Sequence, residues 1–109
     1  MLNKDEGEET YWRQIIRMLK DKYPISVPIS IHRKHIPKKT NANGTTTFNG
    51  SKIQIIIDSS RHHNERVHDL LHEWGHALAI DEAFSHKGRW GTLHGEIIDG
   101  WEKWNDEFE

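Results

Sequence analysis

Two histidines four residues apart, His72 and His76, flank a glutamate, Glu73, in the stretch HEWGH. An α-helix turns by about 100° per residue, so both imidazoles would lie on one face, about 40° apart, and could reach one metal ion. Glu73 would be rotated about 100° from His72, which makes it a poor ligand but lets it touch a water molecule bound to that ion. The motif therefore predicts a metal site with a carboxylate beside it.

A third ligand must come from outside this motif, because a catalytic zinc ion needs three protein ligands and one open position. The chain has no Cys, so every ligand must be a His nitrogen or a carboxylate oxygen. His86 and His94 follow the motif, and Glu96 lies twenty residues after His76, a spacing found where the third ligand is glutamate. The spacing alone leaves these three candidates open.

The segment around the motif has the pattern of an amphipathic helix over residues 62–80. We expect Asp58-Ser59-Ser60 to cap this helix and a short link, Asp81–Ser85, to follow it. The stripe lies opposite the two histidines, so the core should pack behind the helix, and Trp74 is interpreted as a packing residue. The apolar stripe consists of Val67, Leu70, Leu71, Trp74 and Leu78.

The remaining elements predict a small α+β domain covering residues 1–109. Apolar spacing favours a helix over residues 8–22, and alternation favours a half-buried strand over residues 25–31. Asn49-Gly50 separates two β-prone arms, Thr45–Phe48 and Lys52–Asp58, which predicts a tight hairpin. A last helix should run from Trp90 almost to the C-terminus. Gly91, Gly95 and Gly100 inside it would either permit close packing against a neighbour or leave the helix shorter or broken. The sheet would have three strands, at least two of them antiparallel.

Composition argues against several classes of protein. Fifteen Lys+Arg against seventeen Asp+Glu give a net charge of −2, so we expect no nucleic-acid partner and interpret the basic stretch His32–His35 as a solvated loop. The N-terminus is acidic rather than basic and apolar, and no window reaches the ~18 apolar residues of a membrane span. We therefore expect a cytoplasmic protein without membrane contact.

Two blocks of the sequence resemble a known family. LLHEWGHAL at residues 70–78 and HKGRWG at residues 86–91 are similar to the corresponding blocks of small SprT-like zinc metallopeptidases of phages and bacteria, which belong to the zincins. The likeness extends over about residues 44–98. His94 stands where that family would have a tyrosine, and the chain has no zinc ribbon or basic C-terminal extension, which argues against a DNA-repair role.

The resemblance implies a zinc-dependent endopeptidase with one zinc ion per chain. It implies that His72, His76 and His86 are the ligands and that Glu73 is the catalytic acid and base. In such an enzyme, a polypeptide substrate would lie extended along an exposed strand, for which Thr45–Phe48 is the candidate.

Such an enzyme also needs supporting groups. The oxyanion would need a donor, for which His94, Arg89 and His68 are candidates. Asp99, Asp81 or Glu96 could orient a ligand imidazole through its second N–H group.

Two other functions stay open at this stage. The same scaffold could be a non-catalytic zinc-binding module that binds a partner protein, because a chain of 109 residues gives a cleft few walls. A nucleic-acid-associated role through the basic loop ranks below both. The sequence does not indicate an oligomeric state or a cleavage preference.

Overall fold

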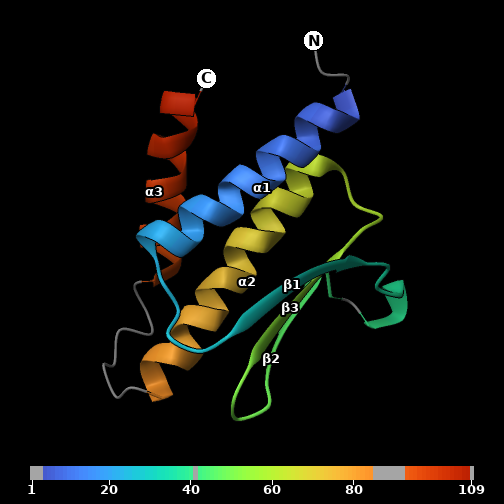
Figure 1. Ribbon diagram of the computed structural model, residues 1–109. Helices are drawn as coiled ribbons and strands as arrows, with labels where there is room; N and C mark the ends of the chain where they lie inside the picture. The colour runs from blue at the N-terminus through green and yellow to red at the C-terminus, as the bar shows by residue number, and fades with distance from the viewer. Residues whose placement is uncertain (1–3, 41, 85–92, 109) are drawn as a thin grey trace.

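The computed structural model describes residues 4–40, 42–84 and 93–108. Its element order is the predicted one, a helix, three strands and two helices, so the α+β class is confirmed (Figure 1). None of the described helices has the length and apolar character needed to cross a bilayer. The elements are α1 (Lys4–Lys22), β1 (Ile29–Lys34), a 3₁₀ turn η1 (Lys38–Thr40), β2 (Gly44–Phe48), β3 (Ile53–Asp58), α2 (His63–Phe84) and α3 (Leu93–Phe108).

Helix α1 packs one apolar face on the core. Trp12, Ile15 and Leu19 are buried, as their helical spacing predicts. The helix ends at Lys22, two residues before Pro24, which cannot donate an N–H to a further turn. It begins at Lys4, earlier than predicted, because its first turn is polar and so carries no apolar periodicity.

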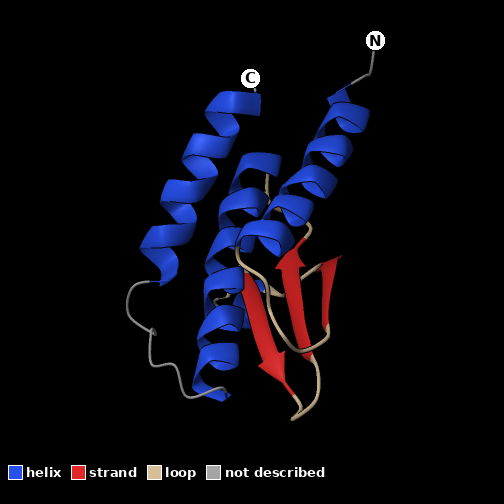
Figure 2. Ribbon diagram, turned by 60° about the vertical axis from the view of Figure 1, so that its left-hand side comes forward, coloured by secondary structure: helices blue, strands red, loops and turns tan. Residues whose placement is uncertain are grey.

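The sheet has the order β1-β3-β2, with β3 in the centre, parallel to β1 and antiparallel to β2. Ile53, Ile55 and Ile57 of β3 are fully buried, and the three α-helices lie on the side of the sheet toward which they point (Figure 2). β2 is an edge strand, as expected for the Thr45–Phe48 arm, and its inward-facing residues lie against α2.

The first strand begins later than predicted. β1 starts at Ile29 rather than at residue 25, and the carbonyl of Pro28 accepts a hydrogen bond of 2.9 Å from the Ile53 N–H. Ile25 and Val27 are half-buried and pack against the core without joining the sheet ladder. Their alternation therefore reflects packing, while the two prolines nearby remove backbone donors that a ladder needs.

The hairpin between β2 and β3 forms as predicted, but its tip is shifted by one residue. Asn49 and Lys52 close the turn through a 3.2 Å bond from the Asn49 N–H to the Lys52 carbonyl, so Gly50 and Ser51 form the tip. Gly50 has a φ of 96°, which a glycine adopts without strain. The Asn49 side chain accepts bonds from the Ser51 and Lys52 N–H groups, and this local bonding explains the shift.

Helix α2 buries its predicted apolar stripe, and the packing role of Trp74 is confirmed. This side chain is fully buried, and its indole N–H donates a 3.1 Å bond to the Tyr23 carbonyl, which ties α2 to the end of α1. On the opposite face, His72 is exposed and His76 is partly exposed.

Both ends of α2 differ from the prediction. Asp58 accepts bonds from the N–H and hydroxyl of Ser60 and so closes the turn after β3, while the Glu65 carboxylate accepts the His62 N–H in the manner of a capping box. At the other end, residues 81–84 continue the helix instead of forming a link, since no Gly or Pro interrupts them.

Helix α3 packs on α2 and on aromatic residues of α1. Trp101 donates a 3.0 Å bond to the Tyr11 hydroxyl, which in turn donates a 2.6 Å bond to Asn105. A Cβ atom at Gly100 would lie 1.9 Å from the Tyr23 hydroxyl, so close packing, one of the two alternatives, explains this glycine. The predicted start at Trp90 lies outside the described residues.

Candidate metal centre

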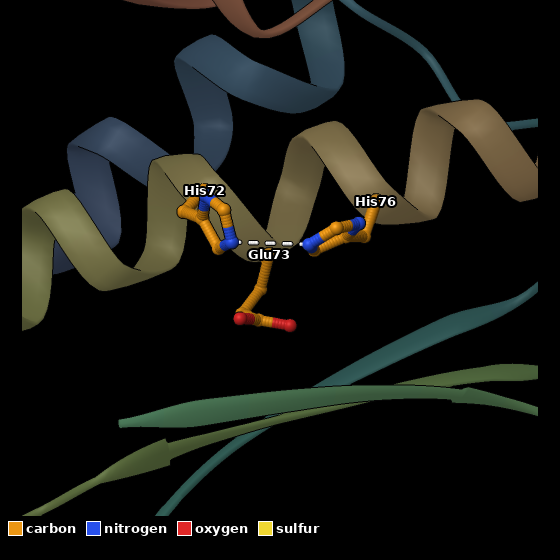
Figure 3. A group of neighbouring side chains, drawn as sticks. All are labelled: His72, Glu73 and His76. Carbon is orange, nitrogen blue, oxygen red and sulfur yellow. Dashed lines mark hydrogen bonds between the residues drawn. The ribbon is translucent and has the colours of Figure 1, made fainter. Parts of the chain in front are cut away.

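The two histidines of the motif point their rings toward one another from successive turns of α2 (Figure 3). Their Nε2 atoms are 3.0 Å apart, and their ring planes are perpendicular. One ligand atom from each of His72, Glu73 and His76 lies within 4.8 Å of the others. Among the described residues, this is the group that could hold a metal ion.

The separation of the two nitrogens fits a shared metal ion. Two imidazoles that bind one tetrahedral zinc ion, with bonds of about 2.0–2.1 Å, hold their nitrogens about 3.3 Å apart. The observed 3.0 Å is close to that value and also short enough for a hydrogen bond between the rings, in which one Nε2 carries the proton. When neither Nε2 carries a proton, both nitrogens are close enough together to bind the same ion.

Glu73 occupies a different environment from the histidines, because its side chain points toward the sheet (Figure 3). It is only 6% exposed. Its Oε1 accepts a 2.6 Å hydrogen bond from the Thr46 hydroxyl, which also lies 3.2 Å from the Glu73 carbonyl oxygen. The Thr46 hydroxyl therefore holds this carboxylate against β2.

Gly44, two residues before Thr46 on β2, makes room for the Glu73 side chain. A Cβ atom there would lie 2.9 Å from Cγ of Glu73 and 3.2 Å from the Ile56 carbonyl oxygen. Neither contact is acceptable without movement, so the absence of a side chain at Gly44 allows the strand and the helix to approach.

These residues line one open groove of about 480 Å³ between α2 and the edge strand. The histidine pair forms its helix side, and the Ala79 and Ile80 side chains continue that side. Gly44, Thr45 and Thr46 form the strand side. A ligand in this groove would thus meet the histidine nitrogens, the Glu73 carboxylate and the backbone of an edge strand together.

Sequence reasoning placed Thr46 in the candidate substrate strand but did not predict its bond to Glu73, and it missed Gly44 as a site residue. The signal was present, since Gly44, Thr46 and Phe48 alternate along β2 and must share a face. The sequence did not indicate that this face of β2 lies against Glu73. That relation is set by tertiary packing over 27 residues of separation.

The third ligand and the other sequence-predicted groups lie mostly beyond the described part. His86 and Arg89 are outside the described residues. His94 and Glu96 belong to the first turn of α3, but their side chains are outside the described set, and Asp99 is exposed on the same helix. The structure therefore leaves the choice of third ligand open.

Two candidate supporting residues have other partners. Asp81 accepts bonds from the N–H and hydroxyl of Ser26 and so fixes the segment before β1 to α2. The His68 ring lies edge-on to Trp101, with their centroids 5.0 Å apart, so it contacts α3. Both side chains help to join the elements that surround the motif.

The basic stretch is partly neutralised. Arg33 makes two 2.8 Å hydrogen bonds with the Glu9 carboxylate, and this hydrogen bonding lowers the pKa of Glu9. The Arg33 guanidinium also lies over the Trp12 ring. His63 packs edge-on against Tyr11, and burial lowers its pKa. Arg33 thus fixes β1 to α1, and residues 32–34 belong to this strand rather than to the predicted solvated loop.

Comparison with protein-family models, curated proteins and solved structures finds no match for this chain. The likeness to SprT-like peptidases therefore rests on the two sequence blocks, and functional inference rests on the geometry of the groove.

Proposed function

We propose that this protein is a zinc-dependent metallopeptidase. In this proposal His72 and His76, with His86 as the third ligand, hold one zinc ion, and Glu73 is the general base. The observation that carries the proposal is the pairing of two converging imidazoles with a buried, strand-held carboxylate in one groove. A solvated histidine-rich helix face would not need a glutamate that is buried and hydrogen-bonded beside it.

The residues divide the chemical work between them. A zinc ion in the site would supply Lewis acidity, which lowers the pKa of a water molecule toward about 7 and polarises the scissile carbonyl. Glu73 accepts the proton of the attacking water at Oε2, because Oε1 is engaged by Thr46. The same oxygen then delivers the proton to the leaving amine. Arg89 and His94 are the proposed donors to the oxyanion, and Asp99 the proposed carboxylate that orients a ligand imidazole.

The edge position of β2 supports a polypeptide substrate. Its outer backbone groups face the solvent side of the groove, beside Glu73 and the histidine pair. An extended peptide added to this edge would form backbone hydrogen bonds and cross the groove at Gly44–Thr46.

Cleavage of an unfolded protein tests the proposal. Zinc-loaded wild-type protein should cleave reduced, unfolded casein, and a chelator should stop it. Glu73→Gln should reduce the rate by about 10²–10⁴-fold, the usual contribution of a general base, and still bind zinc. Glu102→Gln, a change at an exposed glutamate on α3, is the matched control and should cleave like wild type. Bound zinc without any hydrolysis would instead favour the non-catalytic zinc-binding interaction module.

A further inference from the structure

Positive charge is concentrated in the part of the chain that forms the sheet. Between Asp21 and Asp58 the sequence contains no Asp or Glu, although the whole chain has a net charge of −2. Every strand residue except Asp58 lies within this acid-free segment. The Lys and Arg residues of the segment are Lys22, Arg33, Lys34, Lys38, Lys39 and Lys52.

One of these cations lies beside a pocket at the tip of the β2–β3 hairpin. The hairpin-tip pocket has a volume of about 290 Å³ and is lined by Thr47, Phe48, Asn49, Lys52 and Gln54. By strand alternation, Thr47 and Gln54 lie on the sheet face that points away from the helices, and Asn49 and Lys52 belong to the turn that joins the two strands. The Phe48 side chain packs toward the core.

Every polar side chain of this pocket can donate a hydrogen bond. The Asn49 side-chain oxygen already accepts the N–H groups of Ser51 and Lys52, so this side chain presents its NH₂ group. The Lys52 ammonium can only donate, and the Thr47 hydroxyl and Gln54 amide can donate as well. An ionised carboxylate, which only accepts hydrogen bonds, complements such a set.

Lys52 is exposed, and no carboxylate among the described residues lies within ion-pair distance of it. This distinguishes it from Arg33, whose guanidinium is satisfied by Glu9. A carboxylate brought by a ligand would therefore not compete with an internal partner at Lys52.

The pocket lies one residue further along β2 than the metal groove, on the opposite face of the sheet. Thr46 lines the groove, the next residue, Thr47, lines the pocket, and Phe48 lies about 7 Å along β2 from Thr46. A peptide added to the β2 edge would lie about 4.8 Å from it, and a side chain opposite Thr47 would extend over that residue toward Lys52.

We propose that the hairpin-tip pocket is a side-chain subsite that selects Asp or Glu in the bound polypeptide, with Lys52 as the specificity-determining residue. The acidic residue lies two or three positions from the peptide bond placed at Glu73. This inference rests on the proposed function in one respect, the placement of the substrate along β2.

Peptide binding to the zinc-loaded Glu73→Gln protein tests the subsite without hydrolysis. The probes are fluorescent decapeptides of alternating Thr and Val in which a single Glu, or a single Gln, is moved through each position. Fluorescence anisotropy should show the Glu peptide binding about two- to fivefold more tightly than the Gln peptide at one register, as for an exposed ion pair. The preference should weaken at high salt.

Charge variants locate the effect. Lys52→Gln should abolish the preference for Glu, and Lys52→Glu should reverse it, so that the Gln peptide binds more tightly than the Glu peptide. Lys20→Glu, the same change at an exposed lysine on α1, should leave it intact. Equal binding of Glu and Gln peptides, no peptide binding, or a preference that survives Lys52→Gln would overturn the subsite.

Separate measurement of cleavage distinguishes the two claims. Hydrolysis of casein without enrichment of Asp or Glu near the cleaved bonds would refute the subsite and leave the peptidase proposal standing. Charge-selective binding by a wild-type protein that cleaves nothing would refute the peptidase and leave the subsite standing.

Discussion

The Thr46 hydroxyl donates a 2.6 Å hydrogen bond to Oε1 of Glu73, and so an edge strand of the sheet holds the glutamate of the histidine motif. The two residues are 27 positions apart in the chain. The bond leaves Oε2 as the oxygen that can exchange a proton, and it couples the position of the carboxylate to the strand that would bind substrate.

Replacement of Thr46 should impair turnover more than zinc binding. Thr46→Val removes a hydrogen bond to a charged group, which contributes about 1.5–3 kcal/mol, so we expect kcat to fall roughly ten- to a hundredfold. Zinc content should stay at the wild-type level. Thr46→Ser retains the hydroxyl and should recover most of the activity. Equal kcat values for wild type and Thr46→Val would show that this bond does not position the base.

Gly44→Ala should destabilise the protein, because the new Cβ atom would lie 2.9 Å from Cγ of Glu73 and 3.2 Å from a backbone oxygen. Overpacking of this kind costs about 1–3 kcal/mol in free energy of unfolding, which urea denaturation would measure. Gly7→Ala is the control, since a Cβ atom there meets nothing within 4 Å and alanine favours the helix. Wild-type stability in Gly44→Ala would contradict the close approach.

Gly100→Ala should also destabilise the protein, through a clash with the Tyr23 side chain. The new Cβ atom would lie 1.9 Å from the Tyr23 hydroxyl but 3.0 Å from its ring carbon Cζ. In a Tyr23→Phe background the loss in free energy of unfolding should therefore be smaller. A double-mutant cycle measures this coupling, and additive losses would show that the two residues do not meet.

His63 should make the protein less stable as the pH falls. Burial lowers its pKa in the folded state, so below the unfolded value of about 6.5 the unfolded chain binds the proton more readily. The contribution is complete above that pH and is lost as the pH falls toward the lower, folded-state pKa. His63→Phe keeps a ring against Tyr11 and should lose less unfolding free energy between pH 7.5 and 5.5. The measurement should use chelator-treated protein. Identical losses of unfolding free energy in wild type and His63→Phe would show that His63 does not cause the pH dependence.

Local pattern was enough to predict the elements that carry the site. The stripe from Val67 to Leu78 faces the core and leaves His72 and His76 outside, because helical periodicity alone fixes both faces. The hairpin arms were likewise predictable, from two β-prone runs with Asn49-Gly50 between them. The positions of Thr46 and Gly44 against Glu73 depend on how a strand and a helix pack together, which residue spacing does not specify.

The prediction missed features that depend on contacts between side chains rather than on the local residue pattern. The alternation of Ile25 and Val27 reflects packing on the core, and the strand itself begins only at Ile29. The His68 ring lies edge-on to Trp101 of α3, a contact that spacing along α2 does not reveal. The shifted hairpin tip reflects side-chain bonds made by Asn49.

The zinc content of the purified protein tests the central claim most directly. Metal analysis of wild-type protein at neutral pH should find one zinc ion per chain, with the same content in Glu73→Gln and weaker retention in His86→Ala. His72→Ala should lose the metal, because a single imidazole of the α2 pair would remain. A wild-type protein that holds no metal, and takes up none when zinc is added, would contradict the account.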